Sequence, residues 1–224
     1  MPASAEELRI AVENAGEVSA ILVQPDRTHA LLILAHGAGA GMRHPFLHLL
    51  SRELAEVGVA TLRYQFPYME QRRKVPDRPP VLAATVRAAV AAGAKAAGDL
   101  ILLAGGKSMG GRMTSLAASK EPLEKVRGLV FFGFPLHPPN RPGTERGEYL
   151  KLVGVPMLFL QGTCDQFAQL DLLRPVCEGL GKRATLQLFE GADHSFHVPK
   201  SSGRTDAQVM RELAETTAAW TKQL

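Results

Sequence analysis

Cysteine is scarce in this chain of 224 residues, and long hydrophobic runs are missing. The two cysteines, Cys164 and Cys177, are too few for a disulfide framework and lack metal-ligand spacing. The longest apolar runs, 30–35 and 100–104, are far shorter than the roughly 20 residues of a membrane-spanning helix. Acidic residues near the amino terminus stand where a signal peptide has basic ones, and no apolar segment follows them. We therefore expect a cytoplasmic protein that has no membrane partner.

A strong excess of one charge is also missing, because 26 basic and 22 acidic residues leave a net charge of only +4. The one dense patch is 71–78, where four basic residues accompany one acid. Such a patch could attract a phosphate, a nucleic acid or an acidic substrate, or it could be a solvated loop. We favour the loop, since no aromatic residues are interleaved with these charges as they are in nucleic-acid-binding segments. No nucleic-acid partner is expected.

The composition is otherwise that of a globular protein, with 46% hydrophobic and 21% charged residues, which excludes a disordered or fibrous chain. The length fits a single domain over residues 1–224. A domain of this size buries enough surface to fold without a disulfide or a metal. The sequence shows no repeat or linker, and it leaves the oligomeric state open.

Short runs rich in Val, Leu, Ile and Phe alternate with longer helical stretches. The predicted strands are 8–14, 18–23, 29–35, 59–64, 99–105, 126–133, 155–161 and 185–189. The predicted helices are 45–57, 81–97, 109–119, 170–180 and 205–221. From the third strand onward the runs are continuously apolar, as in parallel strands that are covered on both faces. The fold class is therefore α/β, with a hairpin at Asn14–Gly16, a mostly parallel sheet, helices on both faces and an irregular loop over 136–149.

A G-x-S-x-G sequence, Gly106-Lys-Ser108-Met-Gly110, connects the fifth predicted strand to the helix 109–119. Strand, sharp turn and helix form the nucleophile elbow of serine hydrolases, and glycine at 106 and 110 avoids collisions with neighbouring backbone. The same residues match the G-K-[ST] end of a phosphate loop, but the glycine that such a loop needs is replaced by Ile101. A glycine-rich turn without function is the remaining alternative. We favour Ser108 as a nucleophile.

Candidate partners for this serine follow two later strands, because reactive groups of such sheets lie at the carboxyl ends of the strands. His194 follows the eighth strand and is favoured as the base over His197, since it is nearer to the strand end. Asp165 follows the seventh strand and could orient the imidazole, or it could cap the next helix. Asp193 is disfavoured because a side chain seldom reaches the ring nitrogen of its neighbour. We do not expect His194 and His197 to bind a metal, because no further Cys, Asp or Glu ligands stand at a suitable spacing.

Small residues close the third strand in His36-Gly-Ala-Gly-Ala-Gly41. They allow the backbone to approach a ligand and to direct N–H groups at it. We expect the N–H groups of Ala38 and Met109 to form the oxyanion hole, and His36 to orient this loop. A flexible glycine turn is the simpler alternative.

With these residues identified, the chain resembles an α/β-hydrolase of the lidless, dienelactone-hydrolase-like group. Its motifs Gly105-Gly-Lys-Ser108-Met-Gly-Gly-Arg112, His36-Gly-Ala-Gly-Ala-Gly41 and Leu62-Arg-Tyr-Gln-Phe-Pro-Tyr68 are similar to the branch that includes a subunit of the nuclear non-specific lethal complex. The resemblance implies an eight-stranded sheet with an antiparallel second strand, no cap domain, and a triad of Ser108, Asp165 and His194. Dienelactone hydrolases use a cysteine nucleophile, so their substrate does not transfer to this chain.

The sequence therefore predicts a serine hydrolase that cleaves small, short-acyl esters and needs no cofactor or metal. Alternatives are a small peptidase or thioesterase on the same chemistry. A further alternative, from another functional class, is a binding or scaffold protein that retains the fold without catalysis.

Overall fold

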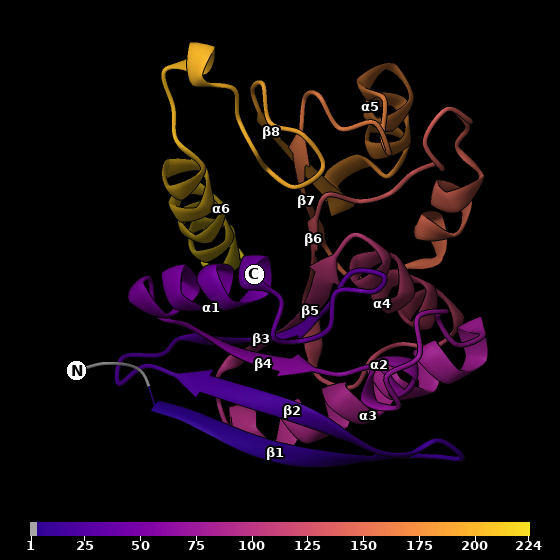
Figure 1. Ribbon diagram of the computed structural model, residues 1–224, viewed down its shortest axis with the longest axis vertical. Helices are drawn as coiled ribbons and strands as arrows, with labels where there is room; N and C mark the ends of the chain where they lie inside the picture. Colours follow the sequence, from indigo (N-terminus) through magenta and orange to yellow (C-terminus); the bar gives the residue numbers. More distant parts are fainter. Residues whose placement is uncertain (1–3) are drawn as a thin grey trace.

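The computed structural model describes residues 4–224 and places them around one sheet of eight strands (Figure 1). The strands are β1 (Ser4–Val12), β2 (Gly16–Gln24), β3 (Ala30–Ala35), β4 (Val59–Tyr64), β5 (Ile101–Lys107), β6 (Val126–Phe132), β7 (Met157–Gly162) and β8 (Ala184–Phe189). The helices are α1 (Pro45–Glu56), α2 (Pro67–Glu70), α3 (Pro79–Ala97), α4 (Met109–Lys120), α5 (Leu170–Gly179) and α6 (Asp206–Thr221), with 3₁₀ turns η1 (Glu145–Leu152), η2 (Gly181–Arg183) and η3 (Lys200–Ser202).

The strand order is β1-β2-β4-β3-β5-β6-β7-β8. Strands β3 to β8 run parallel, whereas β2 is antiparallel to both of its neighbours, β1 and β4. This arrangement confirms the predicted α/β class and the antiparallel second strand. Across residues 4–224 no cap domain interrupts the order of elements.

Helices cover both faces of the sheet, which explains why the central strands are mostly apolar. Every residue of β3 is buried. Leu31 and Ile33 pack in the core under α3 and α4, while Leu32 and Leu34 pack in the core under α1 and α6. Figure 1 shows α1 and α6 together on one side of the strands and α3 and α4 on the other. Because alternate residues face opposite layers, both faces of these strands are mostly apolar, and Thr61, Arg63 and Gln161 are buried polar exceptions.

The structure corrects two details of the predicted elements. The predicted loop 136–149 is wrong in its second half, because η1 begins at Glu145. The three prolines before η1 favour an irregular loop in the sequence pattern. A 3₁₀ turn is also wound more tightly than an α-helix, so η1 does not show the 3.6-residue hydrophobic period that predicts a helix. The four-residue helix α2 was not predicted either, since so short a helix has no measurable period.

The sheet brings the carboxyl ends of β5, β7 and β8 to one edge, where their following loops meet (Figure 1). These loops carry Ser108, Asp165 and His194. Within residues 4–224 no helix has the length and apolar character needed to cross a lipid bilayer.

Candidate active site

Ser108 occupies a strained turn between β5 and α4. Its backbone has φ 52° and ψ −119°, a combination that side-chain-bearing residues rarely adopt. A Cβ atom at either Gly106 or Gly110 would lie 2.5 Å from the carbonyl oxygen of Ala35 on β3. Both predicted glycine requirements are therefore confirmed, and the turn presents Ser108 at the amino end of α4.

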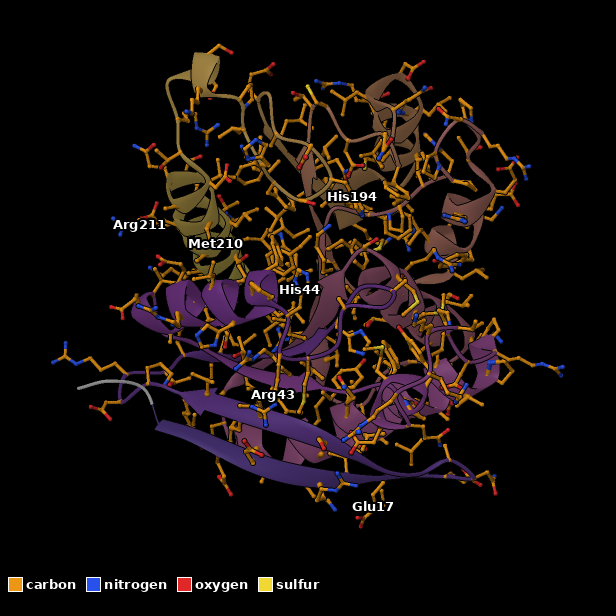
Figure 2. The ribbon with its side chains drawn as sticks, in the orientation of Figure 1. Glu17, Arg43, His44, His194, Met210 and Arg211 are labelled. Carbon is orange, nitrogen blue, oxygen red and sulfur yellow. The ribbon has the colours of Figure 1, made fainter. Side chains whose placement is uncertain are left out.

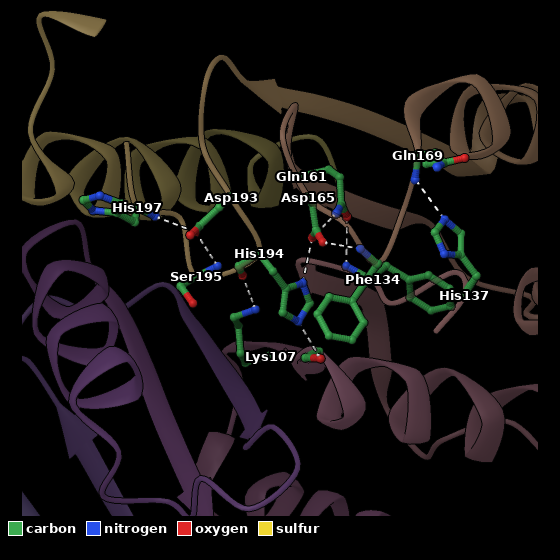
Figure 3. A network of polar contacts seen from close by, with 12 residues as sticks. Lys107, Phe134, His137, Gln161, Asp165, Gln169, Asp193, His194, Ser195 and His197 are labelled. Carbon is green, nitrogen blue, oxygen red and sulfur yellow. Dashed lines mark hydrogen bonds and ion pairs between the residues drawn. The ribbon is translucent and has the colours of Figure 1, made fainter. Parts of the chain in front are cut away.

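The hydroxyl of Ser108 lies in a continuous chain of hydrogen bonds, of which Figure 3 shows the contact between His194 and Asp165. His194 Nε2 is 2.8 Å from Ser108 Oγ, and His194 Nδ1 is 2.7 Å from Asp165 Oδ2. The Asp165 side chain is fully buried, whereas 18% of the His194 side chain is exposed. Since a buried carboxylate cannot donate, we assign the proton to Nδ1, which leaves the Nε2 lone pair facing the serine.

The competing residues lie in other contacts. His197 is exposed and pairs with Asp206, with 2.8 Å between Nδ1 and Oδ2. Asp193 Oδ1 accepts from the backbone N–H groups of Ser195 and His197, so it shapes the turn around His194 (Figure 3). Among residues 4–224 no three His, Cys, Asp or Glu side chains form a group that could hold a metal ion.

Asp165 is not a helix cap, because the N-cap residue of α5 is Gln169. Its Oδ1 accepts from the backbone N–H of Phe167 at 2.8 Å, and its Oδ2 accepts from Gln161 Nε2 at 2.5 Å as well as from His194. Gln161 is completely buried on β7, and its Oε1 accepts from the N–H of Phe134 at 2.9 Å. Sequence analysis missed Gln161; an amide inside an otherwise apolar strand is the signal that could have indicated it.

Lys107 is a second residue that sequence analysis missed, beyond its place in the elbow. Its Nζ donates to the backbone carbonyl of His194 at 2.5 Å and lies 5.6 Å from the ring centroids of both Phe46 and Phe196. Burial lowers the Lys107 pKa to about 8, against the opposing charges of Asp165 and Asp193. Lys107 therefore connects the end of β5 to the His194 loop through a desolvated cation.

The loop after β3 lies against the elbow, as the oxyanion-hole hypothesis requires. A Cβ at Gly37 would be 3.8 Å from Ser108 Cβ. His36 is buried. Its Nε2 accepts a hydrogen bond from the backbone N–H of Phe66, and its Nδ1 lies 2.7 Å from the Gly37 carbonyl oxygen. Burial lowers the His36 pKa to about 4, so the ring is neutral at pH 7 and holds the loop, in agreement with its expected orienting role.

The two proposed oxyanion donors are available on this side of Ser108. Within residues 4–224 the N–H of Ala38 has no hydrogen-bond acceptor, and that of Met109 belongs to the first turn of α4, where helices leave such groups unpaired. Ala38 also lines the cavity in front of Ser108. The role of both groups stays a prediction.

A cavity of about 360 Å³ opens in front of Ser108. Its walls are Gly37, Ala38, Ala40, His44, Phe46, Leu47, Lys107, Ser108, Phe167, His194 and Ser195. The Phe167 ring lies 4.3 Å from the His194 ring between centroids. A larger cavity of about 520 Å³, beside His29 and Gly58, contains none of the predicted site residues. The smaller cavity is therefore the relevant one for this site.

Comparison with known proteins agrees with this fold. Residues 28–222 match the model of the alpha/beta hydrolase domain family. A dienelactone hydrolase from Anabaena variabilis shares the fold at a TM-score of 0.77 and 20% identity, over 100% of this chain and 99% of that one. A serine hydrolase without a lid from Xanthomonas campestris has a TM-score of 0.75 at 18% identity, over 98% and 96%.

An esterase domain from Rhodothermus marinus is similar at a TM-score of 0.72 and 15% identity, covering 98% of both chains. At these identities the likeness shows a common fold, while the family model covers most of the chain. The protein therefore belongs to the α/β hydrolase domain family and has the lidless fold of the dienelactone-hydrolase-like group.

Proposed function

We propose that this protein is a serine hydrolase that cleaves small esters with short acyl groups. The observation that carries the proposal is the hydrogen-bonded chain from Ser108 through His194 to the buried Asp165. The three side chains come from three different strand ends, and each adjacent pair is within hydrogen-bond distance. Nucleophile, base and orienting acid need this order and spacing.

In the first half of the reaction, Ser108 Oγ attacks the ester carbonyl carbon while its proton passes to His194 Nε2. The negative charge on the carbonyl oxygen is stabilised by the N–H groups of Ala38 and Met109. Asp165 stabilises the positive imidazolium through Nδ1–H. Collapse of this intermediate breaks the ester C–O bond, and His194 returns its proton to the departing alcohol.

In the second half, water attacks the acyl group on Ser108. His194 Nε2 takes a proton from that water, and the same two N–H groups stabilise the second oxyanion. Cleavage of the acyl–Oγ bond releases the carboxylic acid, and Ser108 regains its proton from His194. The residues described here perform each of these proton transfers.

The acyl preference rests on the size of the cavity and the lack of a cap between the elements. About 360 Å³ is near the lower end of small-molecule sites. Phe46, Leu47 and Phe167 supply apolar walls, but no inserted domain covers a long chain. Short acyl groups can be enclosed here, whereas a long one would leave apolar surface in water.

The test is labelling with a fluorophosphonate probe combined with hydrolysis of a short activated ester. Ser108→Ala should lose labelling and at least about 10³-fold in kcat, as removal of a triad nucleophile does. His194→Ala should be comparably damaged. His197→Ala is the matched control and should retain most of its activity, because His197 contacts Asp206 instead.

An unlabelled wild type that hydrolyses the ester no faster than Ser108→Ala would refute the enzyme and favour a scaffold protein. Equal damage from His197→Ala and full activity of His194→Ala would refute the assignment of the base. Thioester and amide substrates with the same acyl group distinguish an esterase from a thioesterase or a peptidase.

A further inference from the structure

Arg63, on β4, is a buried cation without a counter-charge. It is 4% exposed, and no carboxylate within residues 4–224 forms an ion pair with it. Its Nη1 donates to the Met42 carbonyl at 3.3 Å, while its Nε has no hydrogen-bond partner. Burying an unpaired charge and an unused donor costs free energy. An arginine that is kept in this state is suited to pair with an anion from solution.

The charged neighbour that acts on Arg63 is another arginine, Arg43. Burial and the neighbouring Arg43 both lower the Arg63 pKa, and no acidic group opposes them. Arg43 itself is exposed and pairs with Glu7 at 2.7 Å. Figure 2 shows Arg43 in the region between α1 and β2. Glu7 therefore pairs with Arg43 and leaves Arg63 without a carboxylate of its own in the described part of the chain.

Arg63 opens into a cavity of about 310 Å³ between β2 and α1. The cavity is lined by Ala5, Val23, His48, Ser51, Arg52, Ala55, Glu56 and Arg63. Arg52 and His48 project from α1 and add polar donors at its mouth, whereas Val23 and Ala55 form apolar walls. Glu56, the one acid in the lining, is exposed and forms no ion pair with Arg63.

We propose that this cavity binds a phosphoryl group, either inorganic phosphate or a small phosphate ester. Arg63 lines the cavity, so its planar guanidinium can donate Nη–H groups to the oxygens of a phosphate. Arg52, which is exposed and also lines the cavity, supplies a second positive charge. The volume exceeds that of the phosphate group alone and reaches the range of small-molecule sites, so a small organic substituent fits.

This site is separate from the proposed active site. The two cavities share no lining residue. The proposal therefore does not depend on catalysis, and a variant without the Ser108 hydroxyl should still bind phosphate at Arg63.

The experiment is titration calorimetry of the full chain with inorganic phosphate, with sodium chloride at equal ionic strength as the reference. Loss of a charge-assisted contact predicts at least about tenfold weaker phosphate binding by Arg63→Met. Arg52→Gln, at an exposed position, should weaken binding about twofold to fivefold. Arg174→Gln removes the same charge from an exposed position on α5 and is the matched control. Ser108→Ala should bind phosphate as the wild type does.

Several results would overturn the proposal. Heat from phosphate no larger than that from chloride would show that no site exists. Unchanged affinity in Arg63→Met, or equal weakening by Arg174→Gln and Arg52→Gln, would reduce the effect to net charge. Loss of binding in Ser108→Ala would place the anion at the other cavity. If Arg63→Met does not fold, Arg52→Gln compared with Arg174→Gln decides the question.

Discussion

Lys107 allows a quantitative test of the electrostatics beside Ser108. Replacing it by Met keeps an unbranched apolar stem between Phe46 and Phe196 and removes the ammonium group. The variant also loses the hydrogen bond to the His194 carbonyl. The pH dependence of stability separates these effects, because only the charge titrates.

The sign and size follow from the lowered pKa. In the unfolded chain Lys107 titrates near 10.5, and in the folded protein burial lowers its pKa to about 8. Between these two pH values the unfolded chain keeps a proton that the folded protein has lost, so the free energy of unfolding rises with pH. At 1.36 kcal/mol for each pKa unit, the rise attributable to Lys107 is roughly 3 kcal/mol, complete near pH 10.5 and absent below pH 8.

The assay is urea unfolding of wild type and Lys107→Met at several pH values from 7 to 10.5. The difference in unfolding free energy, wild type minus variant, should be constant below pH 8 and should then increase by roughly 3 kcal/mol. Lys182→Met, at an exposed position of η2, is the control and should give a flat difference. A flat difference for Lys107→Met, or one that decreases with pH, would refute the desolvated lysine.

Two further predictions concern the elbow and the cavity. Gly106→Ala places a Cβ 2.5 Å from the Ala35 carbonyl oxygen and should lower the free energy of unfolding, measured in urea, by about 1–3 kcal/mol. In the control Gly179→Ala the new Cβ meets nothing within 4 Å, so this variant should not be destabilised. Equal stability of the two variants would contradict the close packing at Gly106. Hydrolysis of p-nitrophenyl esters should favour acyl chains of two to four carbons by roughly tenfold or more in kcat/KM over about twelve carbons, and the reverse preference would mean that a loop closes over the substrate.

The sequence predicted those parts of the site that depend on short-range pattern. Ser108 could be identified because glycine must flank so sharp a turn, and the steric reason is visible in the approach of Ala35. His194 and Asp165 could be identified because the carboxyl ends of parallel strands share one edge. The central strands could be identified because burial on both faces makes them mostly apolar.

Other parts depend on distances that no local pattern records. Gln161 supports Asp165, and also Phe134, which lies 27 residues away along the chain. Lys107 contacts a carbonyl 87 residues away. Arg63 follows Leu62 in a strand that the sequence identifies only as buried, and its lack of a carboxylate partner becomes visible only after folding. Gln161 and Arg63 are polar where the strand pattern requires an apolar residue, and in all three cases the fold supplies the contacts that the pattern does not record.

The backbone strain at Ser108 can be measured directly. With φ 52° and ψ −119°, any side chain at this position costs about 1–3 kcal/mol, whereas glycine adopts the conformation freely. Ser108→Gly and Ser108→Ala both remove the hydroxyl, and they differ in the strained Cβ. Ser108→Gly should therefore be more stable than Ser108→Ala by about 1–3 kcal/mol in urea unfolding, less the roughly 0.5–1 kcal/mol that glycine loses by its freer unfolded chain. A glycine variant that is less stable than Ser108→Ala by roughly 0.5–1 kcal/mol, the full cost of its freer unfolded chain, would show that the turn is relaxed. A more stable glycine variant would mean that serine at this position costs stability, as expected if its hydroxyl is the nucleophile that we propose.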